Sequence, residues 1–286
     1  MKKINHPGTL YIVATPIGNL QDITLRAIEV LQNVDCIAAE DTRHSRHLLQ
    51  HLAINTPLLS LHAHNEEARV GPLIERLQRG ESIALISDAG TPLISDPGSI
   101  LVKKIKNAGI SVVPVPGPCA LIAALSVSGL PTDRFIFEGF LPAKAKLRKE
   151  RLEALLSEPR TLIFYEAPHR ILGSLQMMQQ ILGRDRQMVL VRELTKLFET
   201  VRAGSIGEIV DWVMQDDNQQ RGEIVVLIAG AKEVSVTNAT ISSDKILQTL
   251  LESLPVKQAV EMAAKMTGER KNDLYKRALS MTVLLK

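Results

Sequence analysis

The chain has 286 residues, of which 45% are hydrophobic and 23% are charged, a composition typical of a globular protein with room for two sizeable cores. Its 34 basic residues nearly balance its 31 acidic ones, and aromatic residues make up only 3% of the chain. These totals exclude a disordered or fibrous protein, and they argue against a uniformly basic surface or a platform of base-stacking rings.

The first half alternates short apolar or β-branched runs with amphipathic stretches. The runs predict strands at residues 10–14, 35–39, 57–60, 82–87 and 111–115. The amphipathic stretches predict helices at residues 24–33, 44–51, 66–79, 98–108 and 119–127. Because apolar strands that alternate with helices form parallel sheets with right-handed crossovers, we expect a largely parallel α/β domain over residues 1–128.

One uncharged stretch, residues 107–132, has the length of a membrane helix. Three prolines and a glycine within residues 114–118 interrupt it, so it predicts a buried strand, a tight turn and a buried helix, and no membrane span. The amino terminus does not follow the pattern of an export signal, and the two cysteines are far apart. Both features favour a reducing, cytoplasmic location.

A second α/β domain is expected over residues 129–232. The pattern predicts strands at residues 134–138, 161–165, 187–191, 200–203 and 223–228, and helices after Pro142 and at residues 168–181 and 205–214. Residues 233–286 are expected to contain a polar linker at 234–243 and a helical tail, in which two apolar faces flank residues 267–269. Either a helix-turn-helix or two packed helices would give this tail pattern.

Loops of small residues follow the strands of the first domain. In open parallel sheets, ligands bind beyond the carboxyl ends of the strands, so these loops are candidates for a binding site. The loop after the fourth strand holds an internal echo, LISDAG at 85–90 and LISDPG at 93–98. Either the echo forms two aspartate turns, or Gly90 lets a ligand approach the backbone while Asp88 faces it. A Walker motif and a GxGxxG motif after the first strand are both absent from the sequence.

Three histidines, His44, His47 and His51, can share one face of a predicted helix. A metal site is not expected from them, because no third ligand or HExxH pattern accompanies them. A solvated or RNA-facing helix explains their spacing better.

Six motifs, in order, resemble one family closely. They are TPIGNLQDIT (15–24), AAEDTRHS (38–45), SDAGTPLISDPG (87–98), PVPGPCA (114–120), FYEAPHR (164–170) and RELTK (192–196). Together they resemble the bacterial 16S ribosomal RNA (cytidine 2'-O)-ribose methyltransferases, and the similarity covers essentially the whole chain. This family lies in the tetrapyrrole-methylase-like class of S-adenosylmethionine enzymes. The resemblance implies two α/β domains of that class III methyltransferase type with a small helical tail, usually in a homodimer.

The resemblance also implies which residues contact S-adenosylmethionine in a cleft between the domains. The implied contacts are Asp88, Ala89, Gly90, Thr91 and Pro92, the turn Gly117, Pro118, Cys119 and Ala120, and Tyr165, Ala229 and Gly230 in the second domain. Many relatives carry Ser or Thr where this chain has Cys119, so a hydroxyl contact is not expected there, whereas a backbone contact is.

Methyl transfer to a ribose 2'-hydroxyl needs alignment of sulfur, methyl and oxygen, and it is helped by a proton acceptor. Glu40 and Glu166 are the carboxylates that we favour for that role. For Glu40, together with Asp41, an equally good explanation is that they cap the helix that starts near Thr42.

The near-neutral total charge hides two basic segments. Residues 144–151 hold five basic residues and one acidic residue, residues 245–286 hold eight and four, and the remainder holds 21 and 26. With the resemblance beside them, these segments predict contacts to the phosphates of 16S ribosomal RNA in the small subunit. The predicted RNA-binding residues are Arg43, Lys144, Lys146, Arg148, Lys149, Arg170, Lys196, Arg270 and Lys271.

Two other functions remain open from the sequence. A corrin or porphyrin methylase would have the same cofactor cleft but would not need the basic segments. A non-catalytic RNA-binding protein could keep the fold, although intact small-residue loops argue against it.

Overall fold

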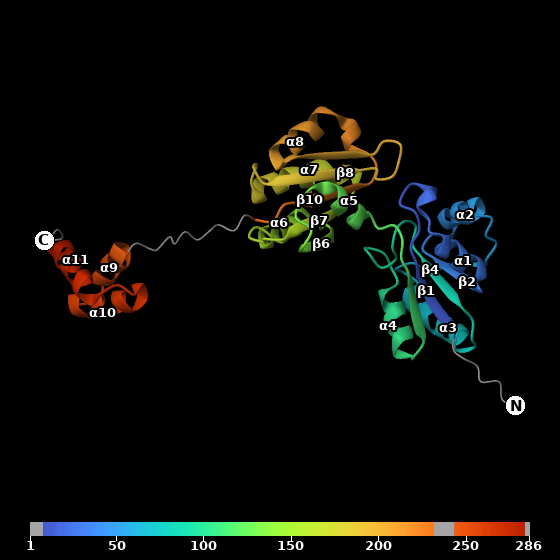
Figure 1. The fold of residues 1–286 in the computed structure, drawn as a ribbon, viewed down its shortest axis with the longest axis horizontal. Helices are drawn as coiled ribbons and strands as arrows, with labels where there is room; N and C mark the ends of the chain where they lie inside the picture. The colour runs from blue at the N-terminus through green and yellow to red at the C-terminus, as the bar shows by residue number, and fades with distance from the viewer. Residues whose placement is uncertain (1–7, 232–242, 284–286) are drawn as a thin grey trace. The chain divides into compact units, whose positions relative to one another are not determined.

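The computed structural model describes residues 8–231 and 243–283. The chain divides into two compact units, residues 1–231 and residues 232–286 (Figure 1). The first unit contains both β-sheets and the second is helical. Among the residues described, no helix has the length and apolar composition needed to cross a bilayer.

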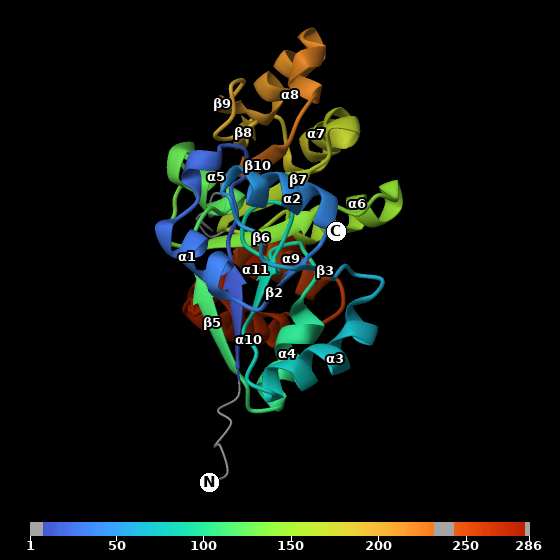
Figure 2. The same ribbon diagram turned by 90° about the vertical axis from the view of Figure 1, so that its right-hand side faces the viewer.

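The first sheet is parallel throughout, as predicted. Its strands are β1 (Thr9–Val13), β2 (Cys36–Ala39), β3 (Leu58–Ser60), β4 (Ile83–Ile86) and β5 (Ser111–Val115). They lie in the order β3-β2-β4-β1-β5, with β5 beside β1 (Figure 2). β2 and β4 are buried at every position, because helices cover both faces of the sheet.

Two pairs of helices cover this sheet. They are α1 (Leu25–Asn33) and α2 (Thr42–His51) on one face, and α3 (Glu66–Gln78) and α4 (Ser99–Asn107) on the other. Side chains alternate along β4, so that Ile83 packs toward α3 and α4 while Ala84 packs toward α1 and α2.

The second sheet is mixed. Its strands are β6 (Phe135–Phe140), β7 (Thr161–Glu166), β8 (Gln187–Arg192), β9 (Thr200–Ser205) and β10 (Ile224–Ile228), in the order β6-β7-β10-β8-β9. β6 and β7 are parallel, whereas β10 is antiparallel to both β7 and β8, and β9 is antiparallel to β8. Helices α6 (Ala145–Ala154), α7 (Ile171–Leu182) and α8 (Ile206–Gln215) pack on one face. The 3-10 turns are η1 (Leu20–Asp22), η2 (Pro168–Arg170) and η3 (Asp217–Gln220).

Helix α5 (Ala120–Ser128) covers the other face of the second sheet. Its Leu121 and Leu125 pack against Ile163 of β7 and Leu227 of β10. The uncharged stretch at 107–132 is therefore a strand, a proline-rich turn and a buried helix, as predicted. The helix follows the last strand of the first sheet in sequence, but it contributes its apolar side to the core of the second.

The predicted strands and helices of the first unit agree with the structure to within two residues at nearly every end. The exception is the helix predicted from residue 168, where η2 precedes α7. Pro168 sits at the first position of that 3-10 turn, which is a favourable place for a residue without a backbone N–H.

The second unit is a bundle of α9 (Ser243–Leu251), α10 (Val256–Thr267) and α11 (Lys271–Val283). Leu247, Val260 and Leu274 form the centre of its core. Gly268 ends α10 in the left-handed conformation, with a φ of 73°, and α11 follows at once. α10 and α11 are thus the two helices expected on either side of residues 267–269, and α9 packs against both. The predicted linker at 234–243 lies outside the described residues except for Ser243.

A buried carboxylate holds the start of α4. The residue before this helix is Gly98, which has no side chain to cap the free N–H groups. Glu66 of α3 replaces the cap, because its Oε1 accepts a hydrogen bond from the Leu101 N–H at 2.8 Å. The side chain is 4% exposed, so its charge interacts with the helix terminus through little water.

We expect Glu66→Ala to lower the free energy of unfolding by about 1–3 kcal/mol, since it leaves a buried N–H group without a partner. Urea denaturation of the variant measures this loss. Glu67→Ala is the matched control, because the neighbouring side chain is exposed, and its effect should stay below about 0.5 kcal/mol. Equal effects of the two substitutions would contradict the capping role.

Candidate functional site

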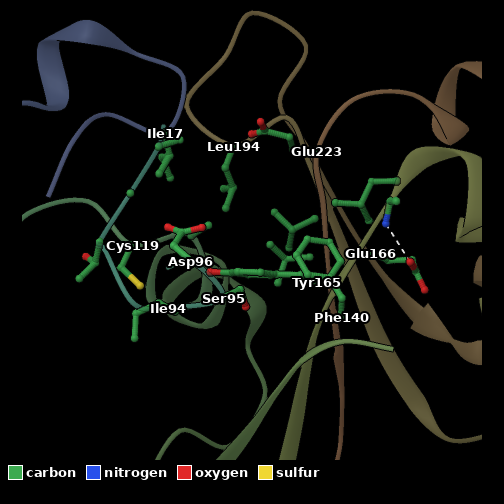
Figure 3. Close-up of a pocket in the computed structure, with 18 of the residues that line it drawn as sticks. Ile17, Ile94, Ser95, Asp96, Cys119, Phe140, Tyr165, Glu166, Leu194 and Glu223 are labelled. Atoms are coloured by element: carbon green, nitrogen blue, oxygen red, sulfur yellow. Dashed lines mark hydrogen bonds between the residues drawn. The ribbon is translucent and has the colours of Figure 1, made fainter. Parts of the chain in front are cut away.

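A cavity of about 360 Å³ lies where strand-end loops of the first sheet face the second sheet (Figure 3). The first-sheet side is lined by Ile17, Ala89, Gly90, Thr91, Ile94, Ser95, Asp96, Cys119 and Ala120. The second-sheet side is lined by Phe140, Tyr165, Glu166, Ala167, Pro168, Val191, Leu194, Glu223, Ile224 and Val225. Most of these side chains are apolar.

Backbone hydrogen bonds join the loops on the first-sheet side. Thr15, after β1, and Gly90, after β4, form an antiparallel pair, with N–O distances of 2.8 and 3.0 Å. The Thr91 hydroxyl donates to the carbonyl of Pro118, after β5, at 2.9 Å. Gly90 has a φ of 80°, and a Cβ there would lie 3.3 Å from Ile17 Cγ2. The loops after three strands therefore form one wall.

Unusual backbone conformations border the cavity on both sides. Leu93 and Ser95 have positive φ in the first-sheet loop, and Glu193 and Thr195 have positive φ in the loop after β8. Such conformations are unfavourable for residues with a side chain and concentrate at ligand sites. The described residues include one other example, Ala53, which lies elsewhere.

Tyr165 connects the two sides. Its hydroxyl accepts a hydrogen bond from the Leu121 N–H at the start of α5 at 3.1 Å, and its ring meets Phe137 and Phe140 edge to face. Burial raises the pKa of Tyr165, so the hydroxyl remains neutral. In Figure 3 this hydroxyl points toward Asp96.

Three carboxylates gather near the first-sheet wall. Burial raises the pKa of Asp96, which lines the cavity; a hydrogen bond with Ser87 offsets part of this effect, and the charge of Asp88 adds to it. Burial also raises the pKa of Glu40, with added contributions from Asp96 and Asp88. Glu40 does not line the cavity itself. Its neighbour Asp41 is the N-cap of α2, so the capping explanation is confirmed for Asp41.

The Glu166 carboxylate points away from the cavity (Figure 3) and is fully buried. Its Oε2 accepts a hydrogen bond from Ser174 at 2.5 Å, and its Oε1 accepts one from the Ala167 N–H at 2.8 Å. Arg170 forms an ion pair with Oε1 at 3.3 Å. This arrangement contradicts the prediction that Glu166 accepts a proton from a substrate, because its oxygens are committed to the protein.

The predicted cofactor contacts do not all line the main cavity. Those that line the cavity are Ala89, Gly90, Thr91, Cys119, Ala120 and Tyr165. Asp88 lines a neighbouring cavity. Pro92, Gly117 and Pro118 do not line the main cavity. A Cβ on Gly117 would lie 3.0 Å from that of Ala14, and the Pro118 carbonyl holds Thr91.

The structure contradicts the prediction for Ala229 and Gly230. β10 is antiparallel to β7, so Ile224 pairs with Glu166 while Ile228 pairs with Leu162. The carboxyl end of β10 therefore lies at the sheet edge opposite to Tyr165. Gly230 packs there against Pro159, and it is the start of β10, from Glu223 to Val225, that lines the cavity.

A second cavity of about 290 Å³ adjoins the first and shares Ile17, Ala89 and Glu223 with it. Its other lining residues are Pro16, Gly18, Leu20, His44, His47, Leu48, Asp88 and Lys196. Lys196 Nζ lies 2.9 Å from Glu193 Oε1 and 3.1 Å from Glu223 Oε2.

The predicted RNA-binding residues differ in how accessible they are. Arg43, Lys144, Lys146, Lys149, Arg270 and Lys271 are exposed. Arg148 is half-buried and donates to Ser174, and Arg170 is held by Glu166 and by the Leu141 carbonyl. Arg170 therefore has partners within the protein, and its contact with RNA stays a prediction. Arg148 and Lys196 are also engaged inside the protein.

Sequence reasoning missed several residues that line the main cavity. Asp96 carries a signal, since it occupies the second LISDxG copy in the place that Asp88 has in the first. Phe140, Leu194 and Glu223 carry none, because their place depends on which strands pair in the second sheet.

Comparisons with known proteins agree with this architecture. Residues 9–210 match the tetrapyrrole (corrin/porphyrin) methylases, and residues 239–282 match the RsmI C-terminal HTH domain. The solved structure of cobalt precorrin-4 methyltransferase aligns with 77% of this chain and 94% of its own length. That of diphthine synthase aligns with 78% of this chain and 90% of its own length. Their TM-scores are 0.57 and 0.62, at 19% and 15% identity.

Curated relatives match nearly end to end. A ribosomal RNA small subunit methyltransferase I from Pseudomonas aeruginosa is 59% identical over 95% of this chain and 97% of its own. The protein of the same name from Escherichia coli O157:H7 is 54% identical over 96% of each chain. The chain belongs to the tetrapyrrole methylase family and, within it, to the ribosomal RNA small subunit methyltransferase I group.

Proposed function

We propose that this methyltransferase transfers a methyl group from S-adenosylmethionine to the ribose 2'-oxygen of a cytidine in 16S ribosomal RNA of the small subunit. The observation that carries the proposal is similarity at 50% identity or more, over nearly the whole chain, to relatives named for small-subunit ribosomal RNA methylation. A cytoplasmic homodimer is part of the proposal.

The main cavity fits the proposed methyl donor. Its apolar lining, which includes Ile94, Leu194 and Val225, suits an adenine ring, and Asp96 offers an acceptor for hydroxyl or ammonium groups. Gly90 keeps the wall free of a side chain that a Cβ would bring against Ile17. When bound, S-adenosylmethionine supplies an electrophilic methyl group on its sulfonium.

The protein's contribution is alignment and proton removal. The joined loops after β1, β4 and β5 fix one wall, and the Tyr165–Leu121 hydrogen bond fixes the second-sheet side relative to it. Of the two favoured carboxylates, Glu40 alone remains a candidate proton acceptor. In the described part of the chain, no hydrogen bond or ion pair engages its carboxylate, and its raised pKa makes it a better base.

Tetrapyrrole methylation is the second candidate, because solved relatives with the same fold act on precorrins and uroporphyrin III. Their identity to this chain is 19–21%, which supports the shared fold alone. The exposed lysines of α6 and the helix-turn-helix unit favour RNA instead.

Mass mapping of 16S ribosomal RNA tests the proposal. RNA from a strain that lacks the protein should lose one ribose methyl on a cytidine, and purified protein with labelled S-adenosylmethionine should restore it. Assembled subunits, free RNA and a tetrapyrrole are offered in parallel. Labelling of the tetrapyrrole, or of nothing, would overturn the proposal.

Glu40→Gln should reduce the single-turnover rate of methylation by about 10²–10⁴-fold, the usual contribution of a general base. In the unaltered protein the rate should rise as the pH rises through the pKa of Glu40, which burial raises above its ordinary value. That acidic limb should vanish in the variant. Glu29→Gln, an exposed carboxylate on α1, should change neither rate nor pH profile. Undiminished methylation by Glu40→Gln removes Glu40 from the mechanism.

The α6 surface should contribute to the salt dependence of RNA binding. Lys146 and Lys149 are 88% and 61% exposed, so a double substitution to Ala should lower the slope of log K against log salt by about 0.7 per lost phosphate contact. The matched control is Lys103→Ala with Lys106→Ala, two exposed lysines on α4. If both pairs gave the same slope, α6 would not be part of the RNA-binding surface.

A further inference from the structure

We propose that the second cavity holds the acceptor nucleotide, with His44 and His47 of α2 and Lys196 contacting its phosphate and ribose. This inference rests on the proposed function, since it assigns the place where the RNA substrate enters. The two histidines belong to the helix for which the sequence favoured a solvated or RNA-facing position.

The position of the cavity is the first argument. Direct methyl transfer requires the acceptor oxygen to come within about 3–3.5 Å of the methyl group. The second cavity shares the lining residues Ile17, Ala89 and Glu223 with the main cavity, so a nucleotide there lies beside the proposed methyl donor. Among the cavities lined by described residues, the one bordered by Tyr11 and Arg26 shares no lining residue with the main cavity.

The second argument is the way Lys196 is held. Its stem packs on Gly18, where a Cβ would lie 2.4 Å from Lys196 Cγ, so the loop after β1 and the loop after β8 approach through this contact. Burial opposes the charge of Lys196, but the hydrogen bonds to Glu193 and Glu223 outweigh it and raise its pKa. An ammonium has three N–H donors, and these two bonds leave one for a ligand oxygen.

The third argument is the mixture of surfaces. His44 and His47 are exposed and lie one turn apart on α2, where they offer donors to a phosphate. Leu20 and Leu48 provide an apolar surface for the flat face of a base. Asp88 and Glu223 are acceptors for ribose hydroxyls. A volume near 290 Å³ suits one small ligand better than a macrocycle.

The kinetic test compares histidines on one helix. His44→Ala with His47→Ala should raise the KM for small ribosomal subunits about tenfold and leave the KM for S-adenosylmethionine within about twofold. His51→Ala is the matched control, because His51 is exposed at the end of the same helix and lines neither cavity. Equal KM values for the double variant and the control would overturn the inference.

A binding test separates this inference from the proposed function. Cytidine 5'-monophosphate is titrated into the full-length protein saturated with S-adenosylhomocysteine, and the imidazole resonances are followed by NMR. The resonances of His44 and His47 should shift while that of His51 stays. No shift at either residue, or an equal shift at His51, would overturn the inference. If they shift but no RNA is methylated, the proposed function fails and the nucleotide site stands.

Discussion

The two backbone hydrogen bonds between Thr15 and Gly90 are the interaction on which the site depends. β1 and β4 are neighbours in a parallel sheet, so their loops leave from the same edge. The pair forces these loops to run antiparallel for one residue. Gly90 can adopt the required positive φ without strain, and the loop that continues from it carries Thr91 and Asp96 into the cavity. Both cavities share Ile17 and Ala89, which lie within two residues of this pair along the chain.

The first sheet was predictable from the sequence because its rules are local. Apolar runs with small-residue loops after them define parallel strands, and all such loops must meet at one edge. The residue pattern alone therefore makes the loop that holds Gly90 a candidate binding site, whereas Ala89 and Cys119 were implied by the family resemblance. Ala229 and Gly230, which the family resemblance implied, lie instead at the opposite end of the second sheet. The strand-end rule does not hold there, because β10 is reversed between β7 and β8. The direction of a strand in a mixed sheet depends on pairing between segments far apart in the sequence, and the hydrophobic pattern of one segment does not reveal that pairing.

Charge was the other limit of sequence reasoning. A count of basic residues cannot separate an exposed lysine such as Lys146 from Arg170, which neutralises a carboxylate inside the fold. The buried group of Glu166, Ser174, Arg148 and Arg170 joins β7, α6 and α7. Leaving a buried carboxylate without its partners is costly, so two of the basic side chains near this helix have a structural task. The remaining α6 lysines are presented by a helix that this network fixes in place.

Helix α5 links ligand binding in the main cavity to the folding stability of the first unit. It starts at the cavity, where Leu121 binds Tyr165, and its apolar side completes the core of the second sheet. A molecule that fills the cavity contacts loops of the first sheet and side chains of the second. It therefore links the two sheets, in addition to the chain segment that connects them. At a hundred times its dissociation constant, such a ligand adds about 2.7 kcal/mol to the stability of the folded state. The protein is therefore most resistant to unfolding and proteolysis when a ligand fills the main cavity, and least resistant when the cavity has no ligand.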